Sequence, residues 1–288
     1  MNTLRWIPSI ILLVAVSVGS APAQQRVRLG ENAALRYWSA FAQMQDSAIT
    51  DQQAQELNAI LDGTAPYDDV KYKDLVEKNS PGTRDNRSGK RPSQLRLGRG
   101  LPTGARRAGG LCSEGAGHGS LNVLYAFHLL IAGDRDRAVR VLATGLRFSH
   151  DVASAGTLFA TVAAKDLIAA HLRAVAFVLH MGELSVPQRL VLQRAVAQLG
   201  AEGLDWQSAL RRELEVFRGL DSQASASLAR IIPTYITVLN NPSMLPTLQR
   251  MIASAPRPLS DMIPSPKRVL EEKQDLTARL LQIGALLH

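Results

Sequence analysis

Histidine, the side chain best suited to acid–base and metal chemistry near neutral pH, occurs six times in this sequence. The six residues are His118, His128, His150, His171, His180 and His288. They form no H-E-x-x-H pattern, in which two ligands one helical turn apart bind zinc. We therefore predict no metal site, and we interpret the histidines as surface residues or hydrogen-bonded core residues.

The possible nucleophiles are equally isolated. Cys112 is the only cysteine, so it cannot form an internal disulfide, and only His118 lies near enough in sequence to activate it. Ser120 follows a Gly117-His118-Gly119 turn but belongs to no G-x-S-x-G motif, and no phosphate-binding glycine motif is present. The sequence predicts no catalytic residue and no cofactor.

Charged residues within a long apolar stretch are a further candidate site. Asp166 and Arg173 lie seven residues apart on one face of the expected helix, with Lys165 beside them. Such a cluster could bind an anion, although a structural ion pair or an exposed helix edge is the commoner arrangement. Glu213 and Glu215 diverge by about 200° around their helix and cannot act as facing carboxylates.

Residues 80–120 differ in composition from the rest of the chain. They contain ten of the 21 glycines, and eight basic residues against two acidic ones. Because apolar periodicity is absent, we predict a disordered Arg/Gly-rich insert that contacts anionic envelope polymers or lipid headgroups. No aromatic residue lies between Tyr72 and Tyr125 to stack on bases, so we predict no nucleic-acid binding. Two compensating frameshifts in a GC-rich gene are the alternative origin of this stretch.

Residues 1–23 have the three parts of a signal peptide. The amino-terminal end is positive, the apolar region spans Ile10 to Val18, and Ala21 and Ala23 match the A-x-A cleavage pattern. An uncleaved anchor is the alternative, but a spanning helix needs about 20 apolar residues. We expect an exported protein, periplasmic or secreted, that is not an integral membrane protein after cleavage.

The remaining sequence predicts an all-α protein, because apolar residues recur at helical spacing and no segment alternates as a strand does. Within the N-terminal helical region, residues 24–79, we expect helices at 32–44 and 67–77. Between them, Thr50 and Gln53 form a capping box for a helix that Gly63 ends. The expected fold is an irregular helical bundle or an α-solenoid of helical hairpins.

Residues 121–255 are expected to form the helical core, in which Gly133 and Asp134 turn one helix into the next. Residues 152–181 predict a long core helix, broken in two near His171. A later helix, at about 224–239, is expected to be kinked or interrupted at Pro233. The inward face of the long helix is expected to carry Phe159, Ala163, Leu167, Ala170, Ala174, Phe177 and Met181.

A Pro-rich linker, residues 256–264, precedes a C-terminal amphipathic helix at 265–288, with Ser265 as its N-cap. An apolar stripe repeats along this helix at heptad spacing, and it must be buried against the body of the protein or against a partner. We predict that the stripe binds another envelope protein. It consists of Leu276, Leu280, Ile283 and Leu287.

Two segments carry resemblances. The hairpin from Leu121 to Arg147 resembles a tetratricopeptide unit, with Gly133 and Asp134 at its turn and Ala138 at its small-residue position. It has no second copy 34 residues later, so the resemblance implies helical-hairpin packing and not a repeat array.

The start of the mature chain gives the second resemblance. Residues 31–42, ENAALRYWSAFA, and the run GDRDRA at 133–138 resemble a group of exported helical proteins of environmental bacteria that have no assigned activity. This resemblance implies that the whole mature chain belongs to the group. The Arg/Gly-rich insert departs from the helical, mixed-charge sequence of such proteins.

These features together predict a non-enzymatic exported scaffold or protein-binding module of the cell envelope. The alternative is an all-α hydrolase of envelope polymers with a site built from dispersed residues. A deep cleft with converging polar groups would favour the hydrolase, whereas an apolar groove or an exposed C-terminal stripe would favour the binding module.

Overall fold

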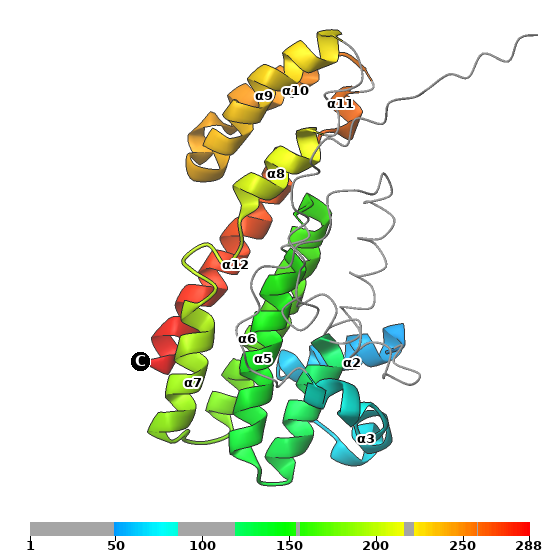
Figure 1. The fold of residues 1–288 in the computed structure, drawn as a ribbon, viewed down its shortest axis with the longest axis vertical. Coiled ribbons are helices and arrows are strands. Elements are labelled where there is room, and N and C mark those ends of the chain that lie inside the picture. The colour runs from blue at the N-terminus through cyan, green and yellow to red at the C-terminus, as the bar shows by residue number, and fades with distance from the viewer. Residues whose placement is uncertain (1–48, 86–118, 154–155, 216–221, 258) are drawn as a thin grey trace, which may run out of the picture.

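Figure 1 shows the fold in a computed structural model. The residues that the structure describes are 49–85, 119–153, 156–215, 222–257 and 259–288. Within these ranges every regular element is a helix, which confirms the predicted all-α class. The predicted signal peptide, the helix at 32–44, and the residues Cys112 and His118 lie outside them.

The N-terminal helices follow the predicted local signals. Helix α2 (Asp51–Leu61) begins with the Thr50–Gln53 capping box, and Gly63 follows its end with φ 72°. Helix α3 (Asp69–Asp85) runs eight residues beyond the predicted end at 77. Helical structure therefore enters the predicted insert from one side, and a helix present from residue 119 enters it from the other.

The hairpin that was expected from Gly133 and Asp134 forms between a helix over residues 119–131 and α5 (Arg135–Ala153). Gly133 has φ 79°, and the Asp134 Oδ1 accepts a hydrogen bond from the Arg137 backbone N–H at 3.1 Å. Asn122 ties the two helices together, because its Nδ2 donates to the Val141 carbonyl at 3.0 Å.

The long helix predicted over 152–181 is broken at a different place. The chain leaves α5 at Ala153 and turns at Gly156, whose φ is 83°; Thr157 then caps α6 (Leu158–His180). The helix is continuous through His171, where a break was expected.

The predicted inward face of α6 is only partly correct. Phe159 and Met181 are 58% and 47% exposed, but Leu167 and Ala174 of the predicted face are buried. Leu172, on another side of the helix, is buried as well. Helices α2, α5, α8 and α12 all contact α6, so apolar residues surround most of it and the sequence pattern does not single out one core face.

Several further helices lie between α6 and the C-terminal helix. Helices α7 (Val186–Ala197), α8 (Trp206–Glu215) and α9 (Ser222–Asn240) follow α6, and α9 runs through Pro233 as one element. A 3-10 turn (Pro242–Met244) leads into α10 (Leu245–Ala253). The predicted linker contains a four-residue helix, α11 (Leu259–Met262).

The C-terminal helix α12 (Pro266–Leu287) begins at the predicted Ser265 cap. It contacts α9 and α10 as well as α6 and α7, and in Figure 1 it runs between these two groups of helices. None of the helices in the described ranges combines the length and the apolar character that crossing a membrane requires.

Candidate functional site

The four residues of the predicted binding stripe lie inside the protein. Leu276, Leu280, Ile283 and Leu287 are all buried. Leu276 and Leu280 lie against Gly203, where a β-carbon would overlap both side chains. Of the two expected arrangements, the structure shows the stripe packed against the body, so these side chains are not presented to a partner.

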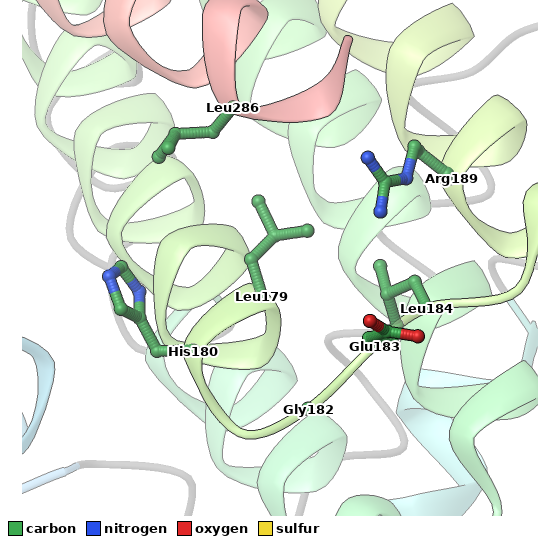
Figure 2. Close-up of a pocket in the computed structure, with 7 residues that line it drawn as sticks. All are labelled: Leu179, His180, Gly182, Glu183, Leu184, Arg189 and Leu286. Carbon is green, nitrogen blue, oxygen red and sulfur yellow. The ribbon is translucent and has the colours of Figure 1, made fainter.

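A pocket of about 310 Å³ lies where α6 and α7 meet the end of α12, and Figure 2 shows the side chains around it. Leu179 points from α6 toward the end of α12, which carries Leu286, and Leu184 lies in the α6–α7 turn. Polar side chains stand at the edge. We call it the C-terminal pocket; its lining residues are Leu179, His180, Gly182, Glu183, Leu184, Arg189 and Leu286.

Hydrogen bonds hold the walls of the C-terminal pocket in place. Arg135 donates from Nη1 to the Glu183 carbonyl at 3.0 Å, which fixes the turn that carries Gly182. Ser185 and Gln188 form a capping box for α7. Gln193 Nε2 donates to the Leu287 carbonyl at 2.7 Å, which joins α7 to the last turn of α12.

Several exposed apolar residues belong to the chain segments that form this pocket. Met181, Val186 and Leu190 are each exposed and lie within two residues of a lining residue, and Leu286 is itself a lining residue that is 43% exposed. Exposed apolar residues in the same segments as an apolar pocket with charged lining residues are typical of sites where another protein binds.

A second pocket, of about 360 Å³, lies between α3, the helix over residues 119–131 and the start of α5. Most of its lining groups are polar. We call it the polar pocket; its lining residues are Val76, Glu77, Tyr125, His128, Leu129, Ala132, Asp134 and Arg137.

Asp69 orients the imidazole of the polar pocket. The Nδ1 of His128 lies 2.8 Å from Asp69 Oδ1, and the Tyr67 hydroxyl donates to the same oxygen at 3.1 Å. Tyr67 is fixed in turn by packing edge-on against Phe127, with ring centroids 5.4 Å apart. Burial, and then the charge and hydrogen bond of Asp69, raise the pKa of Tyr67, so it remains a donor.

The guanidinium of the polar pocket is held on two sides. Arg137 donates from Nη2 to the Tyr125 hydroxyl at 2.7 Å, and its Nη1 lies 3.1 Å from Asp134 Oδ2. Glu77 is exposed and has no ion-pair partner among the described residues. The pocket thus combines an oriented imidazole, a held guanidinium and an unpaired carboxylate.

His171 is a hydrogen-bonded core residue, as was expected for a histidine outside a metal site. Its Nδ1 lies 2.8 Å from the Leu167 carbonyl, which can only accept, so the proton is on Nδ1. Nε2 is therefore free to accept from the Asn122 amide at 3.2 Å. Complete burial lowers the pKa of His171 to about 4, against a smaller opposing effect of the Leu167 hydrogen bond.

The charged cluster that was expected to unite Lys165, Asp166 and Arg173 is divided between different helices. Lys165 Nζ lies 2.7 Å from Glu272 and 3.1 Å from Asp275, both on α12. Its distance to Asp166 is longer, at 3.4 Å. Arg173 instead pairs with Asp62 at 2.7 Å, at the end of α2. Of the alternatives considered for these residues, the structure shows structural ion pairs and not an anion-binding cluster.

The remaining candidate residues either have a structural role or lie outside both pockets. Glu213 accepts a hydrogen bond from the Leu158 backbone N–H at 3.1 Å, and so helps to cap α6. Ser120 lies in the helix over residues 119–131 and lines neither pocket. Within the described part of the chain, no three His, Cys, Asp or Glu side chains gather closely enough to hold a metal ion.

No protein-family model, curated protein or solved structure matches this chain. The resemblance to exported helical proteins of environmental bacteria therefore stays a prediction.

Proposed function

We propose that this chain is a non-enzymatic, exported helical binding module, and that a partner protein of the cell envelope docks at the C-terminal pocket. The observation that carries the proposal is an apolar pocket lined by Leu179, Leu184 and the exposed Leu286, in chain segments that carry further exposed apolar residues. The predicted signal peptide supports the exported location.

The composition of the pocket fits the way in which proteins recognise one another. Leu179, Leu184 and Leu286 form an apolar centre of a size that accepts one or two apolar side chains of a partner. Glu183 and Arg189 supply charges of both signs at the edge, where such groups orient a partner more than they add affinity.

The C-terminal helix keeps its proposed role in binding, but through different residues. Its heptad stripe is used to hold α12 on the body, while Leu286, on the adjoining side of the helix, lines the pocket. A tag fused after His288 would lie beside this pocket, so a partner should be sought with the C-terminus unmodified.

Site-specific photo-crosslinking in the native host tests the proposal. A photoreactive phenylalanine analogue replaces Val186, which is 72% exposed beside the pocket, or Val70, which is 85% exposed on α3. Irradiation should give one discrete adduct from position 186 and none of that mass from position 70. Mass spectrometry of the products also shows whether the chain begins at Gln24.

Binding of the purified partner then provides the decisive measurement. The variant Leu190→Asp should weaken the affinity at least about tenfold, because it places a charge in an apolar contact. The matched variant Val70→Asp should leave the affinity unchanged. Equal adducts from positions 186 and 70, or equal affinities of the two aspartate variants, would contradict the proposal.

The hydrolase remains a second candidate because of the Asp69–His128 pair. A carboxylate on Nδ1 leaves Nε2 as the base, an arrangement that can activate water. Release of soluble fragments from isolated envelope polymer would support this candidate if the variant His128→Asn abolished it and His180→Asn did not. An absence of fragments with every polymer of the host envelope would eliminate it.

A further inference from the structure

Two groups in the lining of the polar pocket, the Nε2 of His128 and the carboxylate of Glu77, have no hydrogen-bond partner among the described residues. Asp69 does not line the pocket, so the Nδ1 edge of His128 faces away from it, toward that carboxylate. The opposite ring edge, which carries Nε2, is the one available to the pocket, and in the neutral ring Nε2 accepts. The carboxylate of Glu77 is a second acceptor at the same opening.

The charges favour a cationic ligand. Glu77 and Asp134 line the pocket and Asp69 lies behind His128, whereas Arg137 is the only permanently charged cation in the lining. Asp134 already pairs with that guanidinium at 3.1 Å. One carboxylate, that of Glu77, is left without a counter-charge among the described residues.

The acceptors come from different elements and do not converge on one point, which suits an extended organic cation better than a metal ion. Glu77 comes from α3, His128 from the helix over residues 119–131 and Asp134 from the turn before α5. A volume of about 360 Å³ is at the small end of the range for ligand pockets and fits a molecule the size of an amino acid.

We propose that the polar pocket binds a small molecule through a primary ammonium group, which donates hydrogen bonds to the Glu77 carboxylate and to Nε2 of His128. An ammonium carries three donors and no acceptor, which matches these groups. Tyr67 and Asp69 fix the imidazole before the ligand arrives, so little ordering is needed on binding. This site is separate from the C-terminal pocket and does not depend on the function proposed for it.

The ammonium group could belong to an amino acid or to a polyamine, and Arg137 distinguishes these two classes of ligand. Its guanidinium has donors beyond those used by Tyr125 and Asp134, and they can bind the carboxylate of an amino acid. A polyamine has no carboxylate and gains nothing from Arg137. An amino acid should therefore depend on Glu77, His128 and Arg137, and a polyamine on Glu77 and His128 but not on Arg137.

Calorimetric titration of the protein purified from its producing cells tests the inference with three probes: L-lysine, 1,4-diaminobutane and glutarate. Both amines should bind and glutarate should not. The variant Glu77→Gln should weaken binding of the amines about tenfold, the effect of one charged hydrogen bond. The matched variant Glu271→Gln, on the exposed face of α12, should bind as the native chain does.

The source follows from the ratio of the two amine affinities. If lysine binds more tightly than 1,4-diaminobutane, and the variant Arg137→Gln removes this difference in affinity, the ligand is an amino acid. If the two amines bind equally, the ligand is a polyamine. The far-ultraviolet circular dichroism of each variant verifies that it is folded. No binding of either amine, binding of glutarate at comparable strength, or an undiminished affinity in folded Glu77→Gln would overturn the inference.

Discussion

His171 combines full burial with hydrogen bonds at both ring nitrogens, and its neighbours pack closely around it. A β-carbon at Gly145 would overlap both the imidazole Nε2 and the Asn122 amide. Ser149 donates its hydroxyl hydrogen to the Gly145 carbonyl at 2.8 Å, which leaves the serine oxygen facing Nδ1 at 3.3 Å. The neutral ring is therefore specified by its neighbours on α5 and on the helix over residues 119–131.

This histidine should make the fold sensitive to mild acid. Its pKa falls from 6.5 in the unfolded chain to about 4 in the folded protein, so between these values only the unfolded state binds the proton. The free energy of unfolding should therefore decrease as the pH falls from 6.5 to 4. The part of it that depends on His171 is fully present above pH 6.5, and the total decrease is about 3 kcal/mol. Urea unfolding at a series of pH values measures it.

The variant His171→Met isolates the contribution of the imidazole. It should be less stable than the native chain at pH 7.5, because Asn122 loses its partner, and its stability should fall less steeply between pH 6.5 and 4. The difference in slope should approach one proton, about 1.4 kcal/mol per pH unit. Parallel curves for the two proteins would show that His171 does not titrate on unfolding.

At the level of the elements, Lys165 is the main polar link between α6 and α12. Burial opposes its charged form, but the hydrogen bonds to Glu272 and Asp275 outweigh this effect and raise the pKa of Lys165. The carboxyl of Asp275 is partly desolvated too, yet hydrogen bonds from Arg279 and Lys165 hold its pKa below the usual value. The neighbouring groups thus stabilise the ionised forms of both Lys165 and Asp275.

Replacement of Lys165 by Met should loosen α12 and destabilise the protein by about 1 kcal/mol, since two carboxylates lose their shared cation in a partly exposed setting. The pKa of Asp275 should rise, which carbon-13 resonances of its carboxyl would report. The matched variant Lys267→Met removes an exposed pair at 3.8 Å and should have almost no effect. An unchanged Asp275 pKa in Lys165→Met would refute the coupling.

Sequence patterns predicted best those features that are decided within one turn of the chain. The caps at Thr50 and Ser265 were predicted and are confirmed, because a side chain three residues from its backbone partner needs no tertiary contact. The turn at Gly133 was found for the same reason. The inward face of α6 was predicted only in part, because several surrounding helices bury different sides of it.

Local sequence patterns could not predict the two candidate sites. Leu179 and Leu184 meet Leu286 only because the C-terminal helix returns to the α6–α7 turn across about a hundred residues of sequence. The same is true of Asp69 and His128, which are 59 positions apart. Neither pair shows a local motif, and a pairing of a lone histidine with a distant aspartate has no signal in a single sequence.

For the molecule as a whole, α12 is the element that joins the two groups of helices. One part of it packs on α6 and α7, and another on α9 and α10 (Figure 1). Lys273 strengthens the second contact: its Nζ donates to the Leu239 carbonyl at 2.9 Å and lies 2.8 Å from Glu202. Because both groups of helices pack on the same helix, α12, we expect them to unfold together.

Leu276 provides the test of this cooperativity, because it is completely buried in the middle of α12. The variant Leu276→Ala should lower the free energy of unfolding by about 3 kcal/mol through loss of apolar contact and formation of a cavity. Native-state hydrogen exchange should show the same decrease for slow amides of α5 and of α9, because a single cooperative unit shares every loss of stability. The control Leu281→Ala, on the same helix but 69% exposed, should change either value by less than about 0.5 kcal/mol. A decrease confined to α9 would mean that α8 to α10 open independently, and that α12 anchors only to α6 and α7.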